Sequence, residues 1–146
     1  MIFLEKNTYN QAVATASRNK QLSSPTYLWS MRHKLTNQTW RFIPYPVPSS
    51  VNYTPSYDLF LINIDTSLPQ TYIYSGSSVV DAVNLHLIDG EYFVKVYEQI
   101  SPSNLNPALS YDVVWEGTAR VDSSDEPSQQ IVSYTATTNT FKVYQG

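Results

Sequence analysis

Residues 111–121, YDVVWEGTARV, alternate between two sets of side chains with a period of two. Successive side chains of a β-strand point to opposite faces of a sheet, so this period predicts a strand with one buried and one solvated face. A glycine inside such a run indicates a bulge or a close approach to the backbone. Period two recurs along most of the chain, and the 3.6-residue period of a helix is almost absent, which favours an all-β fold. The predicted buried set is Tyr111, Val113, Trp115, Gly117, Ala119 and Val121.

Residues 26–46, TYLWSMRHKLTNQTWRFIPYP, predict a β-hairpin that turns at the polar segment KLTN. Large apolar residues recur at every second position of both strands, so they are expected to share the buried faces. These residues are Trp29, Met31, Trp40 and Phe42.

Four further segments complete the assignment. The apolar run LFLINI, residues 59–64, is typical of a strand that is covered on both faces. Residues 44–58 contain four prolines and are predicted to form a long surface loop. One helical turn is predicted around residues 77–84. A second hairpin is predicted at residues 133–146, with its turn near 138–139.

Many short strands separated by turn signals are typical of a β-sandwich or barrel. The chain has 146 residues, about the length of one domain, and neither a linker nor an internal repeat interrupts it. We therefore predict an immunoglobulin-like β-sandwich that forms a single domain over residues 1–146. Its structural core is predicted to contain Trp29, Trp40, Tyr92, Val94, Val96 and Trp115.

The stretch LIDGEYFVKVYEQ, residues 87–99, has two structural interpretations. Asp89-Gly90 is a strong signal for a two-residue hairpin turn, because glycine tolerates the positive φ that a type I′ turn requires. The alternative is a tyrosine corner, in which the hydroxyl of Tyr92 folds back onto the backbone just upstream. The corner is slightly favoured, because it also explains why Phe93 and Tyr97 share the face opposite to the buried one.

The charge of the chain argues against nucleic acid as a partner. The formal net charge is −3, and the only tight basic cluster, Arg32-His33-Lys34, is small enough to be simply solvated. The absence of cysteine excludes disulfides and thiolate metal sites. No apolar run approaches the ~18 residues of a membrane helix, and the start MIFLEKN lacks the basic region of a secretory signal. We expect neither a nucleic-acid nor a membrane partner.

The sequence contains no recognisable catalytic motif. Neither His33 nor His86 lies in a pattern that supports nucleophilic catalysis or metal binding. The acidic segment DSSDEP, residues 122–127, lacks the spacing of a calcium loop and is better explained as a solvated turn. The four glycines are scattered and form no phosphate loop. We therefore expect a protein without enzyme activity, cofactor or metal.

Surface loops are the more informative feature. Residues 44–58, 65–78 and 101–112 are rich in proline, serine and tyrosine. Proline lowers the entropy that a loop loses on binding, while tyrosine offers contact area, so these loops suit a protein held by its neighbours. An equally acceptable interpretation is that the tyrosines only cover the ends of the sandwich. The candidate partner-contact residues are Tyr45, Tyr53, Tyr57, Tyr72, Tyr74 and Leu105.

Four segments carry a resemblance to a known group of proteins: MIFLEKN, PTYLWSMRHKLTNQTWRF, GEYFVKVYEQ and TNTFKVYQG. They resemble small virion structural proteins of tailed phages of Bacteroidetes, crAss-like phages among them. The resemblance implies a protein encoded near capsid and connector genes, assembled in the host cytoplasm and located in the virion. Residues 44–78 depart from that pattern.

The function expected from this resemblance is that of an auxiliary, or decoration, capsid protein. Many copies would bind the lattice of the major capsid protein and stabilise the head. One alternative is a ring or adaptor protein of the head-to-tail connector, with portal and connector proteins as partners. An alternative of another class is a carbohydrate-binding module on a head or tail fibre, with Trp29, Trp40 or Trp115 as a sugar platform.

Overall fold

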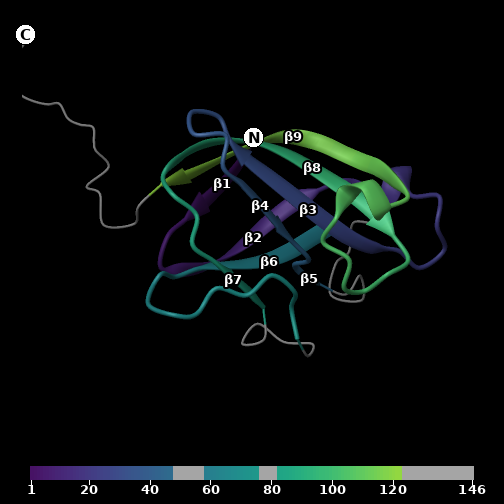
Figure 1. Cartoon of the computed structure of the whole chain (residues 1–146), viewed down its shortest axis with the longest axis horizontal. Coiled ribbons are helices and arrows are strands. Elements are labelled where there is room, and N and C mark those ends of the chain that lie inside the picture. Colours follow the sequence, from purple (N-terminus) through teal and green to yellow (C-terminus); the bar gives the residue numbers. More distant parts are fainter. Residues whose placement is uncertain (48–57, 76–81, 123–146) are drawn as a thin grey trace, which may run out of the picture.

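The computed structural model describes residues 1–47, 58–75 and 82–122, and in these ranges the chain consists of β-strands, turns and two single-turn 3-10 segments (Figure 1). The described helical segments include none that is long and apolar enough to cross a membrane. The 3-10 segments are Ala16–Asn19 and Pro107–Leu109. The strands are β1 (Ile2–Glu5), β2 (Thr8–Ala14), β3 (Thr26–His33), β4 (Thr39–Phe42), β5 (Tyr45–Pro46), β6 (Asp58–Ile64), β7 (Val83–Leu85), β8 (Gly90–Gln99) and β9 (Asp112–Asp122).

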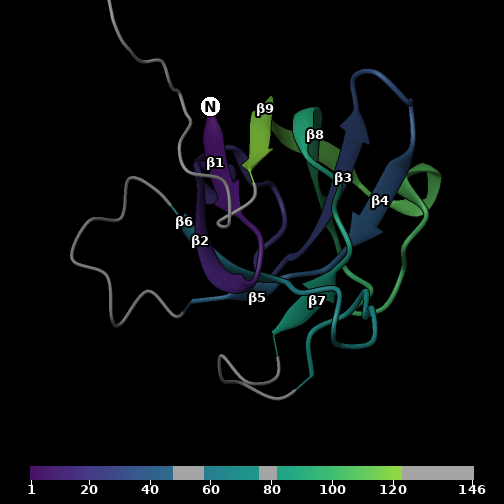
Figure 2. The same ribbon diagram turned by 90° about the vertical axis from the view of Figure 1, so that its left-hand side faces the viewer.

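The strands form two sheets that pack face to face (Figure 2). The first sheet has five strands in the order β1-β9-β8-β3-β4, with β1 and β9 parallel. In the second sheet β6 is central, because it pairs with β2 on one side and with β5 and β7 on the other. This arrangement confirms the prediction of an all-β, sandwich-like fold.

The predicted hairpin at residues 26–46 is present. Strands β3 and β4 are antiparallel, with Trp29 opposite Phe42 and Met31 opposite Trp40. All four side chains are buried, as the alternation predicted. The final residues of the segment do not continue β4, because Tyr45 and Pro46 form β5 and pair with β6 in the other sheet.

Strand β9 follows the predicted alternation only in its second half. The register between β8 and β9 shifts between Val96 and Tyr97, so an extra residue of β9 lies opposite this point. The shift turns Val114 inward, where it is buried, and leaves Val113 partly exposed. Tyr111 was predicted to be buried but is 59% exposed, because it precedes the strand.

Gly117 was predicted to mark a bulge or a close approach, and the structure shows the close approach. A Cβ atom at this position would collide with the six-membered ring of Trp115. The bulge itself lies nearer the start of β9. Trp115 is partly buried and packs against the core with its ring centroid 6.5 Å from that of Trp29.

Strand β6 is covered on both faces, as its continuous apolar run predicted, since Phe60, Leu61 and Ile62 are all buried. The helical turn predicted at residues 77–84 is wrong at its end, because Val83 and Asn84 belong to β7. Residues 77–81 of that turn lie outside the described residues, as do most of the loop at 44–58 and the whole hairpin at 133–146.

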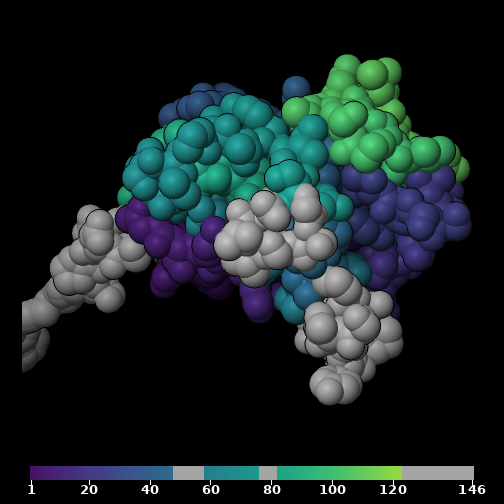
Figure 3. Space-filling model, turned by 90° about the horizontal axis from the view of Figure 1, so that it is seen from below, coloured from purple at the N-terminus to yellow at the C-terminus, as the bar shows by residue number. Residues whose placement is uncertain are grey.

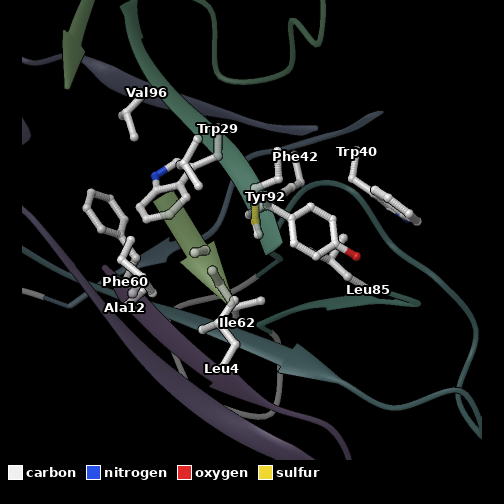
Figure 4. Close-up of a cluster of buried hydrophobic side chains, with 14 of the residues drawn as sticks. Leu4, Ala12, Trp29, Trp40, Phe42, Phe60, Ile62, Leu85, Tyr92 and Val96 are labelled. Atoms are coloured by element: carbon white, nitrogen blue, oxygen red, sulfur yellow. The ribbon is translucent and has the colours of Figure 1, made fainter. Parts of the chain in front are cut away.

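The core lies between the sheets and is rich in large side chains (Figure 4). Trp29 is in edge contact with Phe60 at a centroid distance of 5.1 Å, and Trp40 with Tyr92 at 5.7 Å. Five of the six predicted core residues are fully or almost fully buried, and the sixth, Trp115, is partly buried. The five are Trp29, Trp40, Tyr92, Val94 and Val96.

The stretch at residues 87–99 forms the corner and not the hairpin. The hydroxyl of Tyr92 donates a 2.6 Å hydrogen bond to the backbone oxygen of Ile88. Strand β7, which would be the first arm of a hairpin, pairs with β6 in the other sheet. Gly90 has a φ of 131°, so glycine is required there for the chain to enter β8.

Candidate contact surface

Three of the candidate contact tyrosines gather on one surface, which we call the tyrosine surface: Tyr45, Tyr72 and Tyr74. Backbone hydrogen bonds join Ile43 to Tyr72 and Tyr74, so the segment 72–74 lies beside the chain that leads into β5. The rings of Tyr45 and Tyr74 meet edge to face with centroids 5.6 Å apart. Tyr72 is 41% exposed, and its hydroxyl accepts a hydrogen bond from Gln70. Tyr53 and Tyr57 lie outside the described residues.

A small hollow of about 120 Å³ opens beside Tyr74. Its volume is below the ~300–1,000 Å³ typical of ligand pockets, so it fits a single small side chain. Burial, with smaller contributions from the carboxylates of Asp58 and Glu98, raises the pKa of Tyr27 in its wall to about 12. The lining residues are Pro25, Thr26, Tyr27, Ile43, Pro44, Pro46, Phe60 and Tyr74.

A wider hollow of about 240 Å³ is bordered by Asn63 and Asn84. The two amides are already used, because Asn63 donates to Asn84, and Asn84 donates to the backbone oxygens of Asp65, Leu68 and Pro69. These bonds fasten the connection between β6 and β7 onto the sheet. The hollow is therefore explained by the folding of this connection.

The connection between β8 and β9, residues 100–111, presents a second surface. Three of its apolar side chains are largely exposed: Ile100 at 81%, Leu109 at 73% and Tyr111 at 59%. We call these three residues the loop tip. Figure 3 shows this connection in green, projecting from the body at one end. The candidate Leu105 lies in the same loop but is only partly exposed.

Hydrogen bonds within the loop fix its shape. The side chain of Gln99 donates to the backbone oxygens of Ser101 and Asn104 at 3.0 and 2.9 Å. Asn104 donates back to the Gln99 side chain at 2.8 Å, and Asn106 accepts from the backbone of Ala108 at 3.0 Å. A loop that is already ordered loses less entropy when it binds a partner. The loop tip is thus an exposed apolar surface on a preorganised support.

A buried carboxylate joins this loop to the connection between β2 and β3. Glu98 has no exposed surface, and its oxygens accept the backbone N–H groups of Gln21 and Leu22, all at 3.0 Å. The backbone oxygen of Glu98 accepts the N–H of Tyr111. Because one residue contacts both connections, they lie together at one end of the sandwich.

Leu105, the contact residue predicted in this loop, is only partly exposed, whereas Leu109 of the same loop is 73% exposed. The loop sequence SPSNLNPALSYD contains two leucines, and pattern alone does not distinguish them. The side chain of Asn104 turns into the loop and bonds Gln99, while the exposed Asn106 caps the 3-10 segment that carries Leu109. The two prolines and two asparagines around Leu105 were the available signal of a fixed loop.

The two histidines have structural hydrogen bonds. Nδ1 of the buried His33 accepts the backbone N–H groups of Leu35 and Thr36, so its proton is on Nε2, which donates to the oxygen of Asp89. Nε2 of His86 lies 2.7 Å from the oxygen of Leu68. Among the residues that the structure describes, no three histidines or carboxylates gather as metal ligands would.

The tryptophans named as a sugar platform do not offer open ring faces. Trp29 and Trp40 are buried, and Trp115 packs on Gly117 and on Trp29. Stacking on a sugar requires an accessible ring face, so their positions disfavour a carbohydrate site built on them.

No protein-family model, no curated protein and no solved structure matches the chain.

Proposed function

We propose that this protein is an auxiliary capsid protein of a tailed phage, an immunoglobulin-like β-sandwich that binds the lattice of the major capsid protein in many copies. The virion location is taken from the four segments that resemble phage structural proteins. The proposed mechanism is adhesive, since each copy contacts neighbouring capsid subunits and thereby stabilises the shell.

The immunoglobulin-like topology is supported by strand order and by two side chains. Strands β9, β8 and β3 are adjacent in one sheet, while β2 and β6 are paired in the other, which matches the division of strands in that fold. Trp29 is buried on β3, and Tyr92 forms a corner at the start of β8. Both positions are those in which the fold carries a core tryptophan and a corner tyrosine.

The exposed apolar side chains of the loop tip are the main support for the proposed binding to the capsid. Large apolar side chains that remain exposed on an ordered loop are costly in water, and they are typical of surfaces that bind another protein. The tyrosine surface adds aromatic contact area of the kind enriched at interfaces. The described hollows are small or already occupied by internal hydrogen bonds, which favours binding over catalysis.

Cryo-electron microscopy of the intact phage tests the proposal. Copies of this chain distributed over the whole head, with residues 100–111 against the major capsid protein, are the expected result. If density for this chain is restricted to the portal vertex, the protein is a connector protein and not a decoration protein. Absence of the chain from purified particles would overturn a virion function altogether.

A further inference from the structure

The solvent side of the five-stranded sheet, which we call the outer face, is open around Phe93. Its other end is covered, because Leu28, which pairs with Tyr97 on the same face, is buried. On β8 the residues Tyr92, Val94 and Val96 point into the core, so Phe93 and Lys95 point outward. Phe93 is 45% exposed, with Cζ of Arg32 4.8 Å and Nζ of Lys34 4.9 Å from its ring centroid.

Charges on the outer face are separated by strand. The hairpin of β3 and β4, residues 26–42, contains no aspartate or glutamate. On the other side of β8 the exposed charges of β1 and β9 are mainly acidic, and the one cation among them, Arg120, is paired with Asp122 at 3.1 Å and with Glu91 at 3.6 Å. The cations of the hairpin are Arg32, Lys34 and Arg41, and the acids of the other side are Glu5, Glu116 and Asp122.

The register places unlike charges side by side in rows that cross β8 and β9. Lys95 lies opposite Glu116, and Glu91 lies opposite Arg120. Between these rows Phe93 lies opposite Thr118. A two-fold axis can be placed above the outer face, parallel to the strands and midway between β8 and β9. Rotation about this axis stacks a second copy on the first, with β8 of each copy over β9 of the other. Each charged residue of a row then lies over the residue of opposite charge in the same row of the other copy.

We infer that the outer face is a self-complementary surface that binds a second copy of this chain in an isologous dimer, with β8 of each copy over β9 of the other. Across the interface Lys95 contacts Glu116 of the other copy, and Arg120 contacts Glu91. The two Phe93 rings lie between these pairs, one on each side of the axis, against Thr118.

The charges also select one orientation of the dimer. A two-fold axis perpendicular to the strands would keep each strand over itself, and the acidic side would face the acidic side. The axis parallel to the strands instead brings the basic hairpin near the acidic edge at β1. Like charges held in apposition weaken an interface, so electrostatics decides between the two arrangements.

The area over which the two copies overlap determines the affinity that we expect for the dimer. Four short strands spaced by ~4.8 Å, with ~3.3 Å per residue, overlap over roughly 300–400 Å² in projection. This is smaller than a standard interface of about 800 Å² per partner. We expect a dimer with Kd on the order of micromolar, which weakens as salt screens the ion pairs. The inference does not depend on the capsid function.

Charge exchange on the purified full chain tests the inference by sedimentation equilibrium from low to high micromolar concentration. Lys95→Glu and Glu116→Lys each place like charges in apposition across the interface, so each variant alone is expected to lose about tenfold or more in dimer affinity. An equimolar mixture of the two variants restores unlike pairs and is expected to recover a heterodimer. The double variant Lys95→Glu/Glu116→Lys is expected to recover the homodimer.

A matched control separates this surface from a general effect of charge. Lys20→Glu reverses an exposed lysine of the β2–β3 connection, outside the outer face, and is expected to leave the dimer unchanged. Far-ultraviolet circular dichroism verifies that each variant is folded. A monomer at all concentrations for the unaltered chain overturns the inference. A dimer that the reversals do not weaken, or a mixture that does not associate, overturns it as well.

Cysteine pairs provide an independent test, because the chain has no cysteine of its own. A Thr118→Cys protein mixed with a Phe93→Cys protein is expected to form a disulfide-linked heterodimer under mild oxidation. Thr39→Cys, on the edge strand β4, is the control and is expected to cross-link poorly with either protein. Equal cross-linking of all three proteins would contradict the proposed axis.

Discussion

At the scale of single residues, a few hydrogen bonds decide how the strands begin and end. The hydroxyl of Tyr92 holds the backbone of Ile88 at the entrance to β8. His33 ties the end of β3 to Asp89, and its Nδ1 holds the following turn. Both side chains are buried, whereas Ile88 and Asp89, whose backbone oxygens they bond, lie at the surface.

Replacement of Tyr92 by phenylalanine tests the corner. The variant keeps the ring in the core and leaves the oxygen of Ile88 without its donor. We expect a loss of about 1–2 kcal/mol in the free energy of unfolding, measured by urea titration. Tyr9→Phe, at an exposed position, is the control and is expected to change stability little. Equal stability of the two variants would show that the corner bond contributes nothing.

Alkaline pH tests the burial of Tyr27. In the folded chain burial, followed by Asp58 and Glu98, raises the pKa of Tyr27 from 10.0 to about 12. Between these values the unfolded chain releases the phenolic proton and the folded chain retains it, so stability falls as pH rises from about 10 to about 12. Burial also raises the pKa of Tyr92, which extends the loss to higher pH.

The size of this loss follows from the shift. Allowing for the partial exposure of Tyr27, we expect about 2 kcal/mol from this residue. Urea titrations between pH 9 and 12 measure it, and Tyr27→Phe is expected to reduce the slope of stability against pH. An unchanged slope in that variant would exclude Tyr27 as the source.

At the scale of elements, the strands are held in position by their connections. Glu98 fixes the connection between β2 and β3 by accepting the N–H groups of Gln21 and Leu22. The loop of residues 100–111 is fixed by its own amide side chains. One buried carboxylate thus influences the end of the sandwich that carries the loop tip.

Replacement of Glu98 by alanine removes the buried acceptor of the N–H groups of Gln21 and Leu22. We expect a loss of about 2–4 kcal/mol in the free energy of unfolding, from chemical denaturation. Amide hydrogen exchange is expected to accelerate at Gln21 and Leu22 before the rest of the chain. Lys20→Ala, at an exposed position of the same connection and outside the outer face, is the control and is expected to leave both measurements nearly unchanged.

Element boundaries show where sequence patterns succeed. The hairpin of β3 and β4 was predictable, because a polar turn separates two strands in which Trp29, Met31, Trp40 and Phe42 recur at every second position and face inward. Which residues of β9 face the core was not predictable along the whole strand. The bulge opposite Val96 and Tyr97 reverses the faces of the residues of β9 that precede it. A bulge depends on how two strands pair, which the sequence of either strand does not contain.

At the scale of the whole molecule, the two-layer body presents distinct surfaces for distinct contacts. The loop tip projects from one end, and the outer face of the five-stranded sheet carries separated charges. The proposed capsid contact at the loop tip and the proposed dimer contact on the outer face use different residues, so the two can act together.

Binding to capsids tests the loop tip. Leu109→Asp places a charge in the loop tip, where 73% of the leucine is exposed. The variant is expected to weaken binding to capsids that lack this protein about tenfold or more. The control Leu35→Asp alters a leucine that is 88% exposed in the turn between β3 and β4. Co-sedimentation measures both variants, and equal binding would exclude the loop tip as the capsid contact.

The sequence by itself determined the all-β class, the hairpin of β3 and β4, and the large aromatic residues of the core on these strands and on β8, because period two and large apolar side chains leave few other folds possible. It did not determine that Asp89-Gly90 enters a corner, because the choice depends on whether β7 pairs with β8 or with β6. Tertiary structure also decided which apolar loop residues stay exposed and which charges become neighbours. Both depend on contacts between residues far apart in the chain, whereas a local pattern records only what lies close in sequence.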